Sequence, residues 1–302
     1  MPCFKPLEGY RSRTRSKNGK SPIVFNSRDG YGDLRVAVPC GRCVGCRLER
    51  SRRWAIRCIH EASLYVDNSF VTLTYDDSNL PRDLSLNKTD FQKFMKRLRS
   101  NQSPRKIRYY YCGEYGENTG RPHYHALLFN YSPKDKIVWS EREGNVLWTS
   151  EELTRLWGKG HVVIGEVTFE TAAYTARYIM KKITGEGAQE HYQSLDRETG
   201  EIHQIRPEFS DMSRRPGIGA PWLEKYKTDV YPFDEVVVRG RPMMPPAYYD
   251  DLLEKIDEET LKKVKAARQV SRGKQASNNT RERLDVREKV AKHKLKMKGR
   301  KL

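Results

Sequence analysis

The chain has 302 residues, of which 37% are apolar, and its 57 Lys and Arg against 39 Asp and Glu give a formal net charge of +18. This composition allows one sizeable hydrophobic core, and the positive surplus indicates nucleic acid as a partner, because Lys and Arg gain affinity by releasing counterions from phosphates. No apolar run reaches the roughly 18 residues of a membrane span. The N-terminus lacks a secretory signal, so we expect a cytoplasmic protein with no membrane partner.

By composition the chain divides into four parts. We expect a basic N-terminal module with a cysteine cluster at 1–67, a folded core at 68–185, a proline-interrupted accessory region at 186–260 and a basic tail at 261–302. The tail holds 16 Lys and Arg against 3 Asp and Glu. A helix is expected over Leu261–Val270, whereas Lys292–Lys301 has too few apolar residues for a core and is predicted to be disordered when free.

Hydrophobic periodicity predicts interleaved helices and strands. Apolar residues recur at helical spacing or gather in short β-branched and aromatic runs. These patterns predict helices at 47–66, 87–100 and 170–184, and strands at 69–75, 106–112, 122–129 and 160–168. The order shows no regular strand–helix–strand repeat. We therefore predict an α+β fold, an antiparallel sheet with helices on one face.

A histidine pair lies in the strand expected at 122–129. His123 and His125 are two residues apart, so both imidazoles point to one face of the sheet. Two imidazoles and one carboxylate make an open site for a divalent ion, with positions left for phosphate oxygens. Glu114, just before a glycine-rich loop, is the first choice for the carboxylate, and Glu117 is the second. Two ordinary strand histidines are the alternative.

Two tyrosines share one face of the helix expected at 170–184. Tyr174 and Tyr178 lie four residues apart, and Lys181 continues their line. A phenol with a pKa near 10 is a weak nucleophile at neutral pH unless a metal or a nearby cation assists it. Lys181 is the candidate for stabilising phosphate charge, and plain aromatic packing is the alternative. A second stripe, suited to docking on the sheet, consists of Ala172, Ala176, Ile179 and Ile183.

Together these motifs resemble the HUH endonuclease superfamily, in which a His–hydrophobic–His strand binds a metal and a downstream helix presents one or two tyrosines. The strand Phe70–Tyr75 resembles the first motif of that superfamily, and the paired tyrosines resemble its two-tyrosine branch. Related initiators often carry Lys where this chain has Arg177. Four phrases narrow the resemblance to the replication initiators of gokushovirus-type Microviridae phages: Pro39–Arg47, Cys112–Gly116, Arg121–Ala126 and Tyr178–Gly185.

This resemblance, which covers residues 1–185 well, implies a rolling-circle initiator with its HUH core at 68–185. One tyrosine attacks one strand at the viral origin, forms a 5′-phosphotyrosine link and frees a 3′-hydroxyl for the host polymerase. The second tyrosine attacks later, and the displaced strand is closed into a circle. His123, His125 and Glu114 are implied to hold Mg²⁺ or Mn²⁺. No GxxxxGK[ST] loop occurs, so we expect a host helicase, and single-stranded or supercoiled origin DNA as substrate.

The cysteines fall into two groups. Cys40, Cys43 and Cys46 follow CxxCxxC spacing and, with Cys3 as a fourth thiolate, could ligate structural zinc. Buried thiols without a metal are the alternative. The two remaining cysteines, in a helix and a strand, are expected to pack in the core: Cys58 and Cys112.

Basic and aromatic residues offer further DNA contacts. Arg11, Arg13, Arg15 and the arginines of 47–57 are candidates for backbone contacts, and Tyr109–Tyr111 are candidates for base stacking. Three other functions stay open from the sequence. They are an HUH transposase or relaxase, a non-enzymatic DNA-binding regulator with a structural zinc module, and a capsid-associated protein that condenses DNA.

Overall fold

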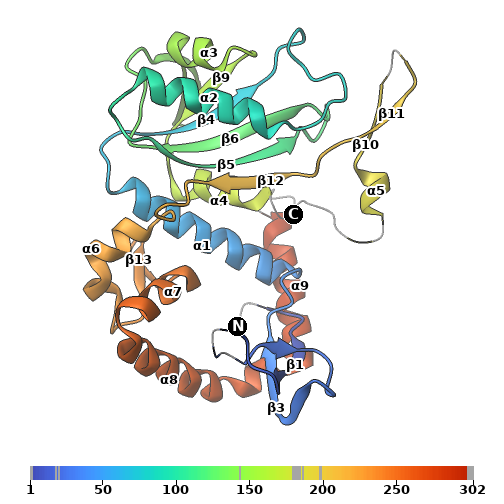
Figure 1. Ribbon diagram of the computed structural model, residues 1–302, viewed down its shortest axis with the longest axis vertical. Helices are drawn as coiled ribbons and strands as arrows, with labels where there is room; N and C mark the ends of the chain where they lie inside the picture. Colours follow the sequence, from blue (N-terminus) through green and yellow to red (C-terminus); the bar gives the residue numbers. More distant parts are fainter. Residues whose placement is uncertain are drawn as a thin grey trace. The chain divides into compact units, whose positions relative to one another are not determined.

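The computed structural model, drawn in Figure 1, describes residues 3–17, 19, 21–142, 144–178, 185, 187–196 and 199–297. Contacts between residues divide the chain into two compact units. We call Met1–Arg50 with Lys265–Leu302 the terminal unit, and Ser51–Val264 the central unit.

The central unit contains a seven-stranded sheet, within the part of the chain that is described. All its neighbouring strands pair antiparallel, in the order β12-β5-β6-β4-β9-β8-β7. This is the mixed fold with a large antiparallel sheet that the sequence predicts. The strands are β4 (Asn68–Thr74), β5 (Arg108–Tyr115), β6 (Pro122–Phe129), β7 (Ile137–Arg142), β8 (Asn145–Thr149), β9 (Val162–Gly165) and β12 (Phe209–Met212).

Helices α2 (Lys88–Asn101) and α3 (Glu151–Trp157) cover one face of this sheet (Figure 1). Tyr124, Ala126 and Leu128 alternate along β6 and join one buried cluster with Phe91 of α2 and Trp157 of α3. Side chains two apart in a strand share a face, so these three positions fix which side of β6 the helices cover.

The opposite face of the sheet is also covered by helices. Leu127 and Phe129 of β6 join a second buried cluster with Ala172 and Ala176 of helix α4 (Phe169–Tyr178) and with Ala55 of helix α1 (Val44–Ala62). The prediction of helices on one face is therefore wrong. The last six residues of β6 are all buried, so the strand needs apolar cover on both sides.

The rest of the central unit, which includes the proline-interrupted region, is built from short elements. Helix α6 (Ala220–Val230), helix α7 (Ala247–Ile256) and the hairpin of β13 (Val236–Val238) and β14 (Arg241–Met243) share a third buried cluster. Helix α5 (Ala188–His191) precedes a hairpin of β10 (Gln193–Leu195) and β11 (Ile202–Gln204). Residues 130–159, for which the sequence predicts no element, supply β7, β8 and α3.

The terminal unit joins the two ends of the chain. Its small sheet has the order β2-β1-β3, from β1 (Leu7–Ser12), β2 (Ile23–Val24) and β3 (Gly30–Val38). Helix α8 (Glu258–Lys274), the short helix η1 (Ala276–Asn279) and helix α9 (Arg281–Met297) follow near the C-terminus. Part of the segment predicted to be disordered, 292–297, is thus helical, because Leu284 and Leu295 give α9 a buried apolar side.

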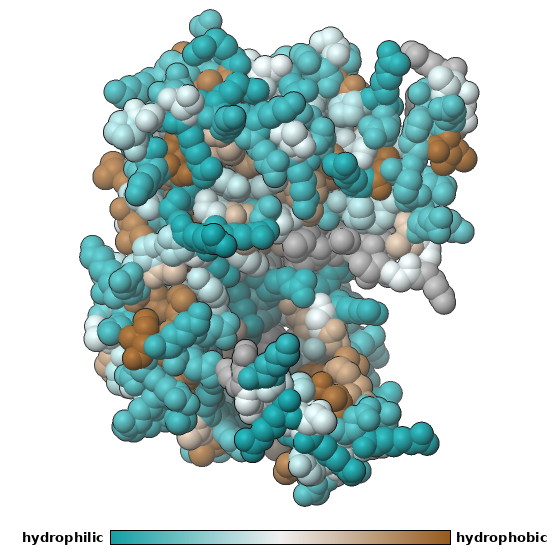
Figure 2. Space-filling model, viewed as in Figure 1, coloured by the Kyte–Doolittle hydropathy of each residue, from teal (hydrophilic) through white to brown (hydrophobic). Residues whose placement is uncertain are grey.

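Hydrophilic side chains cover most of the surface that faces the viewer in Figure 2. Among the described residues, no helix has both the length and the apolar character needed to cross a membrane.

Candidate metal and tyrosine site

The hairpin of β5 and β6 brings three candidate ligands together. Glu114 of β5 is paired with His123 of β6, and Cys112 with His125, so the carboxylate stands across from the histidine pair. The Nε2 atom of His123 lies 2.7 Å from Glu114 Oε1, and the Nε2 atom of His125 lies 2.8 Å from the same oxygen. Glu117, the second choice for the carboxylate, is exposed on the loop between the strands.

The hydrogen bonds of these side chains fit a bound cation. The carbonyl of Arg121 only accepts, so Nδ1 of His123 carries a proton and donates it over 3.1 Å. Nε2 faces a carboxylate oxygen that also only accepts, so without an ion this contact needs a second proton on the ring, whereas a bound cation would take both the Nε2 lone pair and the carboxylate oxygen. Glu114 Oε2 is buried and has no hydrogen-bond partner among the described residues. A divalent ion bound by this set would satisfy all three ligands.

Burial and the contacts among these side chains shift the pKa values of Glu114 and His125. Burial alone would raise the pKa of Glu114, but the imidazoles of His123 and His125 outweigh it and hold that pKa below its usual value. Burial lowers the pKa of His125. A charged carboxylate beside a neutral imidazole is the protonation that metal ligands require.

Tyr174 lies beside His125. Its ring is 5.0 Å from the ring of His125, centroid to centroid, with the planes at 80°. Helix α4 holds it there because Ala172 and Ala176 pack without exposure against the sheet, as the apolar stripe predicts. The side chain of Tyr178 and all of Lys181 lie outside the described residues, as do Ile179 and Ile183.

Thr72 is a hydrogen-bond partner of the candidate site that sequence reasoning missed. It is paired with His125 across β4 and β6, and its Oγ1 lies 2.9 Å from His125 Nδ1. Such a partner orients a ligating imidazole. The sequence signal that could have found it was the alternation of side chains in β4, which places Thr72 on the same face as Phe70. In the structure the ring of Phe70 lies 5.6 Å from the ring of His125, so that face is the one next to the histidines.

Two groups expected to contact DNA are structural instead. Tyr110 and Tyr111 are buried, with Tyr111 stacked 3.6 Å from the ring of Phe91. The prediction that these two tyrosines stack on bases is therefore wrong. The guanidinium of Arg57 lies 4.0 Å from the ring of Trp54 and also contacts Tyr248, so this arginine belongs to the packing of the central unit.

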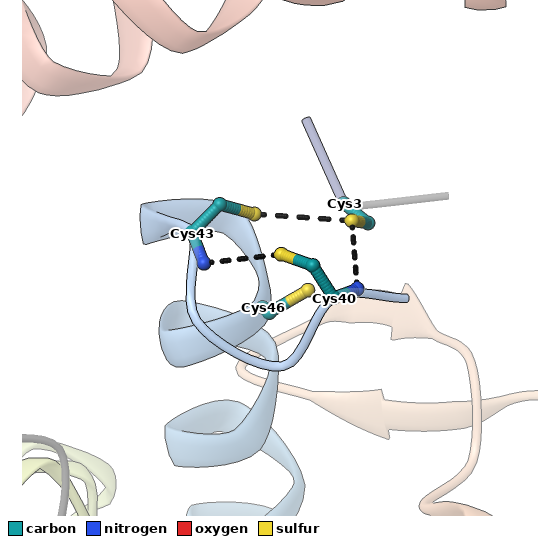
Figure 3. A group of neighbouring side chains, drawn as sticks. All are labelled: Cys3, Cys40, Cys43 and Cys46. Atoms are coloured by element: carbon teal, nitrogen blue, oxygen red, sulfur yellow. Dashed lines mark hydrogen bonds between the residues drawn. The ribbon is translucent and has the colours of Figure 1, made fainter. Parts of the chain in front are cut away.

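The four cysteines of the terminal unit form a compact cluster (Figure 3). The sulfurs of Cys3, Cys40, Cys43 and Cys46 all lie within 4.8 Å of one another. Burial opposes ionisation of Cys43, yet the backbone N–H groups of Phe4 and Cys46 outweigh it and lower its pKa to about 7. The other two cysteines are fully buried in the central unit, as predicted: Cys58 and Cys112.

Six of the seven strands of the sheet, helices α2, α3 and α4 and the Glu–His–His group lie in the stretch that identifies the class of protein. Residues 68–183 match the family model described as Replication-associated protein ORF2/G2P. The chain is 35% identical over 266 residues to Replication-associated protein VP4 of Bdellovibrio phage phiMH2K, which covers 84% of this chain and 78% of that protein. It is also 35% identical over 280 residues to Replication-associated protein ORF2 of Spiroplasma virus 4, and this match covers 84% of this chain and 81% of that protein.

A third relative, Replication-associated protein ORF4 of Chlamydia phage 1, is 28% identical over 240 residues, covering 76% of this chain and 57% of that protein. No solved structure matches the chain. The chain belongs to the replication-associated proteins of Microviridae-like phages, which confirms the resemblance seen in its motifs.

Proposed function

We propose that this protein initiates rolling-circle replication by nicking one strand at the viral origin with a tyrosine. The observation that carries the proposal is the position of Tyr174, whose ring stands 5.0 Å from that of His125 beside the Glu114–His123–His125 group. Packing alone would not require a tyrosine next to two imidazoles and a buried carboxylate. The family of the chain, with its phage replication proteins, supports a DNA origin as the substrate.

The proposed reaction conserves the energy of the phosphodiester. The phenol oxygen of Tyr174 bonds to phosphorus and loses its proton. The bond from phosphorus to the 3′ oxygen breaks, and that oxygen takes up a proton. The product is a 5′-phosphotyrosine and a free 3′-hydroxyl. Attack of a 3′-hydroxyl on this link reverses the reaction and closes a circle, so rejoining needs no nucleotide triphosphate.

The side chains of the site have distinct parts in this proposal. Glu114, His123 and His125 would hold Mg²⁺ or Mn²⁺, and the ion would polarise the scissile phosphate as a Lewis acid. Thr72 and the carbonyl of Arg121 orient the two imidazoles. Tyr178 is proposed as the second nucleophile, and Lys181 as the residue that stabilises phosphate charge.

The setting of the reaction is proposed from the same family. A single-stranded or supercoiled origin in the host cell cytoplasm would be the substrate, a host helicase would unwind the duplex, and the host polymerase would extend the 3′ end. A transposase or relaxase would use the same chemistry, and a mapped replication origin separates those functions from an initiator. The replication proteins among the relatives favour the initiator.

The test is formation of a covalent adduct. Wild type, Tyr174→Phe, Tyr178→Phe and the double variant are incubated with Mn²⁺ and a single-stranded origin oligonucleotide labelled at its 3′ end, then run on a denaturing gel. We expect a label that migrates with wild type and is absent from the double variant. Tight DNA binding with no adduct on any fragment of the phage genome would overturn the proposal in favour of a DNA-binding regulator.

A further inference from the structure

The geometry of the cysteine cluster matches a tetrahedral zinc site. Four thiolates around Zn²⁺ at about 2.3 Å lie roughly 3.8 Å apart, and the sulfurs of Cys3 and Cys43 are 3.9 Å apart. Three backbone N–H groups donate to the sulfurs over 3.3 Å, those of Phe4, Cys40 and Cys43. Donors aimed at sulfur suit thiolates, which carry negative charge, better than neutral thiols.

The cluster ties together segments that are distant in the sequence. Leu7 and Val38 form the pair at the open end of the β1–β3 ladder, and Cys3 and Cys40 lie just beyond it. Cys43 precedes helix α1, and Cys46 lies in its first turn, where the partial positive charge of a helix N-terminus favours thiolates. Figure 3 shows all four side chains converging from these segments.

Helix α9 contacts the residues next to Cys3. The guanidinium of Arg287 lies 6.0 Å from the ring of Phe4, and Lys5 Nζ lies 3.7 Å from Glu288 Oε2. Glu288 is buried and Lys5 is exposed, and the pair connects the N-terminal segment to α9. The cysteine cluster therefore lies at the junction of the N-terminal sheet, the start of α1 and α9.

The net positive charge of the protein comes from this unit. The terminal unit contains 25 Lys and Arg against 7 Asp and Glu, a formal net charge of +18. The central unit contains 32 of each and is formally neutral, although it carries the candidate nicking site. Because phosphate binding depends on positive charge, the unit with the cysteines is the one equipped to hold a nucleic acid backbone.

We propose that the terminal unit is a zinc-bound module that binds the phosphate backbone of DNA, separately from the neutral unit that contains the nicking site. Cys3, Cys40, Cys43 and Cys46 hold one Zn²⁺, and the basic helices near the C-terminus supply the phosphate contacts. The choice of DNA as the partner rests on the proposed function, whereas the zinc site does not depend on it.

The zinc site is tested on the full chain. Metal analysis of purified protein should give one zinc per chain for wild type and for the control Cys58→Ala, and none for Cys43→Ser/Cys46→Ser. Cobalt replacement in wild type should produce the visible absorption of a tetrahedral thiolate site, a readout that does not depend on how the variants fold. Wild type that neither contains zinc nor gives this spectrum would overturn the zinc site.

The DNA-binding role is tested by charge variants. Lys294 and Lys296 are exposed on α9, and Lys93 and Lys96 are exposed on α2 of the central unit. Lys294→Gln/Lys296→Gln should reduce the slope of log affinity against log salt for nonspecific DNA by up to about 1.8, since each phosphate contact contributes about 0.9. Lys93→Gln/Lys96→Gln, with the same loss of charge, should leave the slope unchanged.

An equal effect of the two double variants, or none from the α9 pair, would overturn the role of the terminal unit. Tyr174→Phe distinguishes a failure of this proposal from a failure of the proposed nicking reaction. It should keep the zinc and the full salt slope while the covalent adduct is reduced. Absence of an adduct in every protein, with zinc and salt slopes as expected, would overturn the nicking reaction alone.

Discussion

Glu114 is the single residue on which the candidate metal site depends most. It is 2% exposed and meets both histidines through one oxygen. Glu114→Gln removes the negative charge that binds a divalent ion, so we expect Mn²⁺ affinity to fall by at least about tenfold, the lower range for disturbing even the partners of metal ligands. Isothermal titration calorimetry with Mn²⁺ measures this affinity. Glu117→Gln, on the exposed loop, is the control, and equal affinity in both variants would contradict the assignment.

His60 gives the central unit a stability that depends on pH. It is buried, stacks 3.5 Å from the ring of Trp222, and its Nδ1 lies 2.9 Å from the hydroxyl of Tyr249. Burial lowers the pKa of His60 to about 4, whereas an unfolded chain protonates histidine near 6.5. Between these values the unfolded state binds more protons, so stability falls as pH falls.

The loss attributable to His60 should approach roughly 3 kcal/mol from pH 7 to pH 4, at about 1.4 kcal/mol for each pKa unit. His60→Phe keeps an aromatic ring against Trp222 but does not titrate. Urea unfolding at several pH values should therefore give a flatter dependence for the variant. Parallel pH curves for the two proteins would show that His60 is not the group responsible.

At the level of elements, the join of β4 to β9 has a strict steric requirement. Gly160 has φ +139°, and a Cβ there would lie 2.3 Å from the backbone nitrogen of Asp76 and 2.5 Å from the carbonyl oxygen of Thr74. These atoms belong to backbone that cannot yield, because Thr74 and His161 exchange two hydrogen bonds beside them. The glycine lets β9 approach the strand that carries Thr72.

Gly160→Ala should therefore lower the free energy of unfolding by about 3 kcal/mol or more, the upper range for stored backbone strain. Gly120→Ala is the matched control, since Gly120 also has positive φ, at +64°, but meets nothing within 4 Å. That variant should lose only about 1 kcal/mol from its left-handed conformation. Denaturant titration compares the two, and similar losses would refute the steric argument.

The elements predicted from local sequence patterns differ in how well they agree with the structure. The strands at 69–75 and 122–129 and the helix at 87–100 agree with β4, β6 and α2 to within a residue or two. Their spacing is dominated by one buried face or by a continuous apolar run. By contrast, the sequence predicts no element where β7, β8 and α3 lie, although each contains apolar residues. These segments are short, and β8 joins the rest of the sheet through the pairing of Trp148 with Ile164 of β9, a tertiary contact.

At the scale of the whole molecule, the separation of charge from the candidate nicking site predicts how salt affects the reaction. If the terminal unit makes three phosphate contacts, KM for origin DNA should rise roughly 40-fold between 50 and 200 mM salt, from a slope of about 0.9 per contact. The turnover number at saturating DNA should change little, because the central unit is formally neutral. Nicking rates measured across a salt series test this, and parallel loss of both constants would contradict it.

Local spacing in the sequence determined that His123 and His125 share a face, that Tyr174 lies in a helix with Ala172 and Ala176, and which cysteines were candidates for zinc. These follow from the fixed periods of strands and helices. Only the tertiary structure decided that Glu114 pairs across from His123, that helices cover both faces of the sheet, and that the two basic ends form one unit carrying the whole net charge. Register and contacts between distant segments depend on the packing of the whole chain. The spacing of residues within one segment carries no information about that packing.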